Sequence, residues 1–515
     1  RSNAHKMKRT TTFALATLAA LSVSATSTDA KPDAVAAWVG DSVPALYATS
    51  GDNPALRSFA HPYGLTILGI DYGTMRRDSI IAPQLGRGFD RYGVGASTYT
   101  RVGTDMVLEG HASYHRGTTR DVVWNETADI FMIYPYMAAD SVGGDIQNEI
   151  YDFGGSYSDR RGRLLWGVSL DYTAGLHWRS RDPRPRNVTA NLRTRAGIAW
   201  ALSPKAIAGF AARYTRYKQT SSIKFESEMG QDKVYHLTGL GTQYQRFAGS
   251  GLSTHYNADL WGVSIDLRPD SIGGIGPSAS FSYDGMDMNI LLTDLNKLPM
   301  AKITSYALDA RAGYTWRCNL NSWSVMAFAS TSLRKGTENI FGDPASGIYP
   351  QIGSLSMYRH RLCNAGAEML WVMQRDHMTV FSARLSSQYQ RSMQLYISPR
   401  QKMEAERWLT SADLGATLPL KGRILGHLNI GASVAPVLSS NLEYTAANAP
   451  HSLHMLMMSQ YDVLAAGTSA FDAAVAVTIP VGRIALRPQV RYAHGHYNGI
   501  RADSDAVEAA VTIAF

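Results

Sequence analysis

The sequence has little of what most familiar protein classes require. It has no run of about 20 apolar residues, which a membrane-spanning helix needs. Only two cysteines occur in 515 residues, so a disulfide framework is excluded. The formal net charge is a mild +8, with no basic arm and no nucleic-acid motif. We therefore expect neither a helical membrane protein nor a nucleic-acid partner.

The common catalytic motifs are also missing. There is no Gly-x-Ser-x-Gly elbow and no His-Glu-x-x-His zinc helix. The glycine-rich segment 86–93, GRGFDRYG, lacks the strand–loop–helix setting of a phosphate-binding loop. Single Ser, His and Asp residues are expected on the inward face, as in barrel lipases and proteases, so a hydrolase remains the alternative. We expect no enzymatic activity and no cofactor.

What the sequence does contain is a long alternation of apolar and small or polar residues. In LLWGVSLDYTAGLHW, residues 164–178, every second side chain is apolar over fifteen positions. A period of two predicts a β-strand, and this strand is far longer than the usual five or six residues. One face that is apolar along such a length suits a lipid environment. Trp166 and Trp178 then fall near its two interfaces, as an aromatic girdle requires.

The same alternation recurs along the chain, and the connections between strands alternate in length. Short turns are predicted at 203–205, 319–321, 374–377, 421–423 and 481–483, and long connections near 116–145, 218–254, 334–355 and 439–459. Short inner turns and long outer loops are typical of bacterial outer-membrane barrels. The further strands with this pattern are predicted at 187–200, 205–217, 301–317, 404–420, 482–498 and 506–515.

The predicted fold is therefore all-β: a transmembrane antiparallel up-and-down barrel spanning residues 64–515. We count eighteen strands, the first near 64–73 and the last at 505–515, with sixteen as the alternative. Closure follows because sheet edges cannot remain unpaired in lipid. The last strand ends on Phe515, and this ending resembles the signal that the outer-membrane assembly machinery reads. By that resemblance, the chain is a client of this machinery.

The residues before the barrel divide into three parts. Residues 7–30, with Lys8 and Arg9 before the apolar run 13–25, predict a secretory signal peptide. Residues 1–6 precede the first methionine and are interpreted as a cloning remnant or an upstream extension. Residues 31–63 are expected to form a short periplasmic or lumen-entering segment. The location expected for the mature chain is the Gram-negative outer membrane, in contact with its lipid and lipopolysaccharide.

Two resemblances to known families bear on function. The element Asn53-Pro54-Ala55-Leu56 resembles one near the N-terminus of fatty-acid-transporter-like barrels, whose N-terminus folds into the lumen. The segment Asp182-Pro183-Arg184-Pro185-Arg186-Asn187 resembles a Bacteroidota family of outer-membrane barrels of unknown function. That resemblance implies the fold, the compartment and partnership with TonB-dependent nutrient transporters and surface lipoproteins. It implies no catalytic residues.

Three groups of residues are candidate sites. The first is an outer connection whose arginines suit phosphate or carboxylate, with a solvated loop as the alternative. The second is a charged lumen lining, which either selects solutes or pairs internally; we favour pairing. The third is a loop rich in Met and His, interpreted as a protein contact, loop packing, or a copper or haem site. The outer connection contains Arg179, Arg181, Arg184 and Arg186. The lumen lining consists of Asp171, Arg193, Arg195, Arg213, Asp309, Arg311, Arg487 and Arg491. The loop rich in Met and His contains His451, His454, Met455, Met457 and Met458.

Three functions remain open at this point. The first is uptake as an accessory subunit of a TonB-dependent nutrient transporter complex, which we favour. The second is a passive porin or a channel for hydrophobic substrates. The third is a structural or lipid-binding barrel without transport. Co-purification of a partner and single-channel conductance would discriminate between them.

Overall fold

The computed structural model describes residues 51–61, 63–227, 233–247, 253–270, 275–293, 297–345, 348–375, 378–445, 450–500 and 502–515. Across these residues the chain forms one large antiparallel sheet that closes on itself, because β1 pairs with both β2 and β22. The sheet has 19 strand segments, but β18 and β19 both pair with β17 and are two parts of one strand broken at Pro436. The barrel therefore has 18 strands, as predicted.

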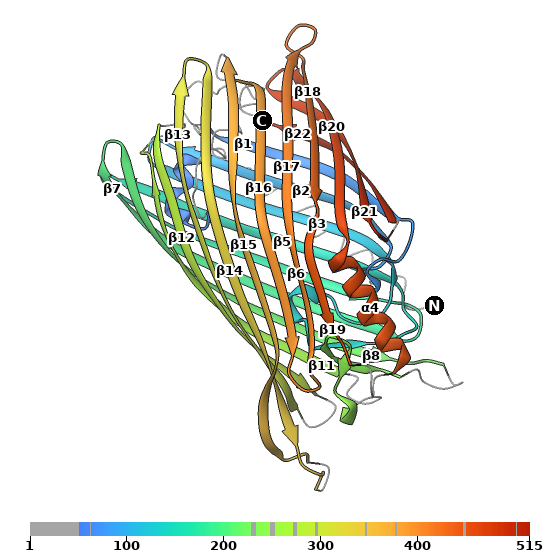
Figure 1. Ribbon diagram of the computed structural model, residues 1–515. Helices are drawn as coiled ribbons and strands as arrows, with labels where there is room; N and C mark the ends of the chain where they lie inside the picture. Colours follow the sequence, from blue (N-terminus) through green and yellow to red (C-terminus); the bar gives the residue numbers. More distant parts are fainter. Residues whose placement is uncertain are drawn as a thin grey trace, which may run out of the picture.

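The strands follow one another around the barrel in chain order (Figure 1). Their bounds are β1 Leu65–Arg77, β2 Gly88–Val102, β3 Met106–Val122, β5 Gly144–Arg161, β6 Leu164–Trp178, β7 Arg184–Ser203, β8 Ala206–Lys224, β11 Ser253–Arg268, β12 Gly276–Leu292, β13 Leu298–Cys318, β14 Asn321–Phe341, β15 Gln351–Arg375, β16 Met378–Tyr396, β17 Gln401–Pro419, β18 Leu425–Ala435, β19 Val437–Glu443, β20 Gly467–Val481, β21 Ile484–Asn498 and β22 Ala502–Ala514.

The remaining elements are short strands and helices. Strands β4 Met137–Ala139, β9 Tyr235–Gly239 and β10 Thr242–Gln243 form a separate small sheet. The helices are η2 Pro54–Phe59, η3 Pro83–Leu85, α3 Ile130–Ile133, η4 Gln245–Phe247 and α4 His451–Ala465. None of the helices in the described ranges is long and apolar enough to cross a membrane.

The connections give the barrel two different ends. At one, here called the turn end, strands are joined by short turns such as 162–163, 204–205 and 319–320. At the other, the loop end, lie the longer connections, including 123–143, 225–252 and 444–466. Figure 1 shows the turn end at the top, with the C-terminus, and the long β14–β15 hairpin projecting at the bottom. The predicted turn at 374–377 includes residues 376–377, which lie outside the described residues.

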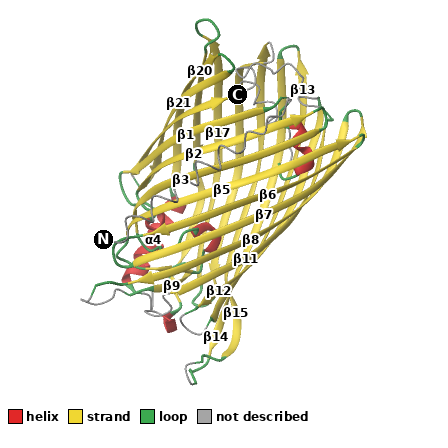
Figure 2. Cartoon of the chain, turned by 180° about the vertical axis from the view of Figure 1, so that it is seen from behind, coloured by secondary structure: helices red, strands yellow, loops and turns green. Residues whose placement is uncertain are grey.

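Several predicted loops were too long. Strands β3, β8, β14 and β15 continue well beyond the apolar band, so residues 334–355 are mostly strand (Figure 2). The physical reason is that strand pairing continues wherever backbone groups find partners, and polar side chains do not stop it once lipid is no longer the solvent. Alternation of apolar residues therefore located the membrane-facing part of each strand and missed its extension.

The outward face carries the apolar residues of every second position. On β6, Leu170 is 51% exposed, whereas its neighbour Asp171 points inward and pairs with Arg195. Aromatic side chains mark both limits of this face on β13, where Tyr306 stacks near Tyr283 and Trp316 stacks near Trp323. Ten residues at roughly 3.3 Å each and a tilt near 45° separate the two levels by about 23 Å, close to the apolar band of a membrane barrel.

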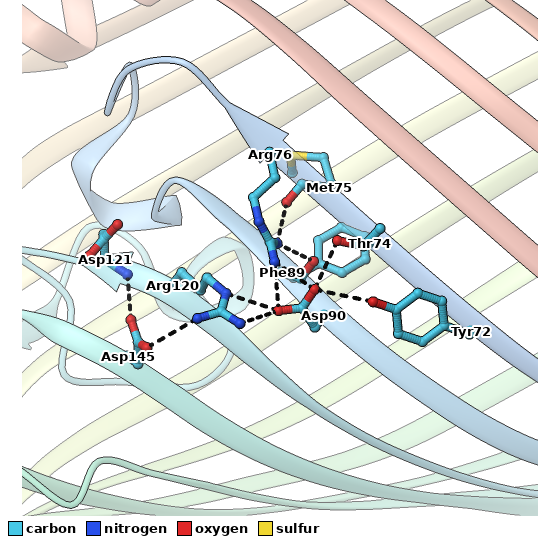
Figure 3. Close-up of polar contacts among 9 residues, drawn as sticks. All are labelled: Tyr72, Thr74, Met75, Arg76, Phe89, Asp90, Arg120, Asp121 and Asp145. Carbon is cyan, nitrogen blue, oxygen red and sulfur yellow. Dashed lines mark hydrogen bonds and ion pairs between the residues drawn. The ribbon is translucent and has the colours of Figure 1, made fainter.

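Charged residues continue the outward face beyond this band at the loop end. Figure 3 shows Asp90 of β2 between Arg76 of β1, at 2.7 Å, and Arg120 of β3, at 2.9 Å. Thr74 donates to the same carboxylate at 2.8 Å, and Arg120 also lies 3.8 Å from Asp145. This network is at the position expected for lipid headgroups, where paired charges keep a strand surface polar. Comparable outward pairs on other strands are Lys302–Asp287, Arg216–Asp259 and Arg391–Glu404.

The two cysteines lie far apart on the barrel. Cys318 ends β13 at the turn end, and Cys363 lies within β15 opposite Thr331 of β14. Both are free thiols, because a disulfide tolerates a Cα separation of only about 4.4–6.8 Å. We expect alkylation of the denatured, unreduced protein to label both thiols in an intact-mass measurement. A mass two hydrogens lower without labelling would show that this strand assignment is wrong.

Candidate functional site: a roofed cavity in the barrel lumen

The inward face is lined by charges that pair with one another. Arg195 of β7 binds Asp171 of β6 at 2.6 Å. Arg213 of β8 contacts Asp284 of β12 and lies 2.7 Å from Asp52 of the N-terminal segment. Opposite charges so placed neutralise one another and link strands that are adjacent, as β6 and β7 are, or separated by one strand, as β8 and β12 are.

The other predicted lining residues also face inward. Arg311 lies 3.0 Å from Asp309 on the same strand, and Arg491 lies 3.2 Å from Asp472. Arg487 shares the inward face of β21 with Arg491. Arg193 lines a small cavity of about 240 Å³ beside Asp171. Apart from Arg193, these predicted residues act mainly through contacts within the protein.

Residues 123–143 do not extend into solvent but fold into the loop end of the lumen. Their side chains Trp124, Ile133, Tyr136 and Met137 are buried in an apolar cluster that also includes Met288 and Ile290 of β12. Strand β4 of this segment pairs with β9 from the long 225–252 connection. The two connections together form a packed roof over the lumen. We call residues 123–143 of this roof the roof segment.

A buried ion cluster holds the roof segment to the wall. Arg179, after β6, lies 2.6 Å from Glu126 and 3.0 Å from Asp140, and all three side chains are nearly inaccessible to solvent. Asn187 of β7, fully buried, donates to the backbone oxygen of Glu126 at 3.0 Å. The segment 182–187 therefore lies beside residues that anchor the roof, and this location gives its sequence a structural role.

The predicted arginine loop is thus corrected. The connection between β6 and β7 is only residues 179–183, because β7 begins at Arg184. Arg179 is buried and Arg184 pairs with Asp182 at 2.7 Å, so neither is free for an external phosphate. Arg181 and Arg186 are exposed. The four arginines do not form one surface, because the chain turns Arg179 inward to compensate two buried acids.

The pKa values of the cluster are shifted in opposite directions. Burial, followed by the hydrogen bond and charge of Asp140, raises the pKa of Glu126 well above its ordinary 4.5, and Arg179 offsets only part of this. Burial also acts to raise the pKa of Asp140, but hydrogen bonds from Glu126, the Gly143 N–H and Arg179 lower it. The cluster is most stable with one proton on Glu126 and Asp140 ionised.

This gives a pH-dependent roof. Glu126 stabilises the packed state fully below its unfolded pKa, and that contribution is lost as pH rises through the raised value. We expect the opening free energy of residues 123–143, from hydrogen exchange corrected for intrinsic rates, to fall with rising pH above about 4.5. Glu126→Gln should remove most of this dependence, because the amide cannot ionise. An unchanged slope in that variant would contradict the assignment.

The segment rich in Met and His is a helix, α4, and not the predicted loop. Leu, Met and Ala favour helix, and the helix buries Leu453, Leu456 and Met457 against the roof and wall. His454 stacks on Tyr444 with ring centroids 5.2 Å apart. His451, Met455 and Met458 lie on one face of the helix, where Met455 is 54% exposed. The opposite face of the helix is largely buried. The predicted partner contact is therefore reduced to the outer face of α4.

Helix α4 completes the roof where the wall is incomplete. Strand β19 pairs with β17, whereas β20 starts only at Gly467 and pairs with β18. The helix occupies the space beside β19 at the loop end (Figure 1). Ser459 donates to Ile81 O at 2.9 Å and Gln460 to Gln84 at 2.6 Å, which joins the helix to the β1–β2 connection.

Below the roof the lumen contains a cavity of about 1230 Å³. Its surface includes α3 of the roof segment, the end of α4 and the inward faces of strands around the barrel. A volume of this size exceeds that of an ordinary drug-sized ligand site. Polar side chains that contribute to its lining include His177, Asp284, Arg334, His360, Gln394 and Arg407.

At the turn end the N-terminal segment lies inside the barrel. Helix η2 packs Ala55 and Phe59 against Leu165, Ala199 and Ile207. Gly197 of β7 is required here, since an added Cβ would lie 2.0 Å from the Asn53 side chain. Asn53 accepts from the Ala55 N–H at 3.0 Å and so caps the helix. The described part of the predicted N-terminal segment thus enters the lumen.

The comparison with known proteins adds a family. The model for a family of unknown function, DUF6850, matches residues 54–515. The chain belongs to this family. The match agrees with the resemblance to an uncharacterised barrel family, whereas the bacterial phylum and the use of the 182–187 motif as a mark of the family stay predictions. No curated protein matches the sequence.

Solved structures of outer-membrane barrels resemble the DUF6850 chain weakly. The siderophore receptor PirA from Pseudomonas aeruginosa is 9% identical, with a TM-score of 0.36 over 87% of this chain and 80% of that one. The outer membrane transporter YddB from Escherichia coli is 9% identical, with a TM-score of 0.39 over 87% and 80%. OccAB4 from Acinetobacter baumannii is 8% identical, with a TM-score of 0.32 over 88% and 98%. Similarity this low carries no argument about the function of this chain.

The sequence missed the residues that define the cavity. Arg334 and Arg407 lie on strands whose inward face carries few other charges, and Phe131 lies in the long connection predicted near 116–145. No local pattern marks a connection that folds inward. The apolar run Ile130–Ile133 within an otherwise polar connection was the available signal.

Proposed function

We propose that this chain is an outer-membrane barrel that takes up a solute through its own lumen. The observation that carries the proposal is the cavity of about 1230 Å³ inside a closed barrel, beneath a roof fixed to the wall by specific polar contacts. The outward apolar band and its aromatic limits support the membrane location. Assembly by the outer-membrane machinery and contact with lipopolysaccharide follow from that location.

The roof favours uptake of selected solutes over a passive pore. A general porin keeps a water-filled channel, whereas here an apolar cluster from the roof segment, β9 and β12 fills the loop end. The cavity below it is a site in which a solute can be held. Opening of the roof at the loop end and displacement of the N-terminal segment at the turn end would then let the solute pass.

Filling the cavity tests this proposal. Ser332 of β14 faces the cavity, and the adjacent Thr331 faces outward and is exposed. The source bacterium and a strain that lacks this gene are grown in the same medium. Components that the wild type removes from the medium and the deletion strain leaves there are the solutes whose uptake is lost. We expect Thr331→Trp to restore that uptake and Ser332→Trp to fail, at equal amounts of folded barrel. Full uptake by Ser332→Trp, or a deletion strain that takes up every component normally, would contradict lumen transport.

A second candidate function, a subunit of a TonB-dependent transporter complex, is favoured by the projecting β14–β15 hairpin. Ile348 is 63% exposed and Ile352 is 68% exposed at its tip, with Leu355 close behind. Apolar residues gathered on a projection into water are typical of a contact with another protein. We expect a partner in native outer membranes to co-purify with the wild type and to be lost from Ile348→Asn/Ile352→Asn. Purification of the wild type as a lone barrel would contradict this role.

A further inference from the structure

Two arginines that line the cavity have no carboxylate partner among the described residues. Arg334 of β14 donates from Nη1 to the backbone oxygens of Phe131, at 2.8 Å, and Tyr134, at 3.0 Å, and from Nε to Ser305 at 3.2 Å. Arg407 of β17 donates from Nη2 to the backbone oxygen of Leu464 at 2.8 Å. All these acceptors are neutral, so neither positive charge is neutralised by a neighbouring acid.

The other charges around the cavity leave a positive excess. Asp284 is paired with Arg213, and Asp129 accepts a hydrogen bond from the Tyr217 hydroxyl at 2.6 Å. Among the described residues that line the cavity, one acid, Asp129, and two arginines, Arg334 and Arg407, therefore have no ion-pair partner. In the rest of the described lumen, arginines such as Arg195, Arg311 and Arg491 have acids within 3.2 Å.

Both guanidinium groups retain donors that no protein group in the described residues uses. Arg334 has Nη2, and Arg407 has Nε and Nη1. The bonds to the roof fix the orientation of each group, because Arg334 is held by α3 and the residue after it, and Arg407 by the last turn of α4. A guanidinium held in this way presents its remaining N–H groups to an anion without further loss of conformational entropy.

Apolar side chains surround these two cations. Phe131, whose backbone oxygen holds Arg334, has a side chain that is 76% exposed and lines the cavity. Met132, Leu362, Met403, Val463 and Leu464 contribute to the same surface. An exposed phenylalanine inside a lumen is unfavourable against water and favourable against an apolar ligand.

We propose that the cavity binds an amphipathic organic anion, with its carboxylate, sulfonate or phosphate group at Arg334 and Arg407 and its apolar body against Phe131. The inference rests on the proposed uptake through the lumen and names the class of solute. The cavity is large enough for many different molecules. The two arginines favour a ligand with a negative charge, and the apolar surface favours a ligand with an apolar body.

Binding of three probes that share one apolar body tests the charge requirement. The probes are 2-naphthoate, neutral 2-naphthamide and the cation 2-naphthylmethylammonium, titrated by calorimetry into the full barrel in lipid nanodiscs. We expect naphthoate to bind roughly tenfold or more tightly than naphthamide, because a hydrogen bond to a charged group is stronger than one to a neutral group. The cation should bind most weakly. Empty nanodiscs correct for partition into lipid.

Variants separate the two parts of the site. Arg334→Gln and Arg407→Gln should each weaken naphthoate about tenfold and leave naphthamide nearly unchanged. Phe131→Ala should weaken both probes. Arg311→Gln is the matched control, since Arg311 lies on the inward face but outside the cavity lining and pairs with Asp309. Heat-modifiable migration of each variant verifies that the barrel has formed.

Three results would overturn the proposal: equal binding of naphthoate and naphthamide, unchanged naphthoate binding in both arginine variants, or no naphthoate binding up to its solubility. Each leaves the proposed uptake standing if Ser332→Trp still blocks transport in cells. If naphthoate binds as expected but Ser332→Trp transports normally, the anion site exists and lumen transport fails. The two claims are therefore distinguished by separate measurements.

Discussion

Arg179→Met is expected to open the roof. The substitution leaves Glu126 and Asp140 buried without their cation, and removal of one partner from a buried ion cluster costs about 3–5 kcal/mol. The roof segment is held to the wall at this cluster, so the loss acts on the roof before it acts on the barrel. We expect larger single-channel conductance in planar bilayers and faster hydrogen exchange in residues 123–143, with unchanged exchange in the strands.

Two variants control this experiment. Arg181→Met removes an exposed arginine two residues away and should change neither measurement. Combining Arg179→Met with Glu126→Gln and Asp140→Asn makes the cluster neutral and should restore much of the protection, because no unpaired charge remains buried. Wild-type conductance and protection in Arg179→Met would show that the roof is held by its apolar contacts alone.

Leu170→Arg is expected to prevent assembly. Leu170 lies on the outward face of β6, 51% exposed, between Gly155 and Thr194 of the neighbouring strands. An arginine on the lipid face costs about 2–4 kcal/mol near the middle of the membrane. We expect the yield of heat-modifiable barrel in outer membranes to fall severalfold or more.

The matched control is Thr173→Arg on the same strand. Thr173 faces the lumen and donates to Asp152 at 2.6 Å, so an arginine there finds both water and a carboxylate. Its barrel yield should stay close to that of the wild type. Equal yields for Leu170→Arg and Thr173→Arg would show that the faces of β6 are assigned wrongly.

The predictions that held depend on short-range patterns. The strand predicted at residues 164–178 is β6 with the same bounds, and the barrel has the predicted 18 strands closed by β1 and β22. Alternation is readable from neighbouring residues, since each side chain faces lipid or lumen according to its position in the strand. The inward orientation of Asp171, Arg195 and Arg213 follows from the same rule.

The corrections concern connections, where no periodic constraint applies. The sequence predicts one exposed arginine loop at residues 179–187, but Arg179 contacts acids that lie 53 and 39 positions earlier in the chain. The sequence predicts a loop at residues 451–458, but these residues form a helix that is stabilised by burial against distant strands. In both cases the partner decides the role, and it is not visible in the local sequence.

By itself, then, the sequence predicted the barrel, its two faces and the alternation of short and long connections, and it favoured eighteen strands over sixteen. Lipid imposes a period of two on every strand, and this constraint is local. Only the tertiary structure decided that the roof segment enters the lumen and that a cavity lies beneath it. It also decided that Arg334 meets no acid in the described part of the chain and instead donates to backbone oxygens about 200 positions earlier. Whether a charge is paired depends on which residues the closed barrel brings together, and closure joins positions that no sequence pattern relates.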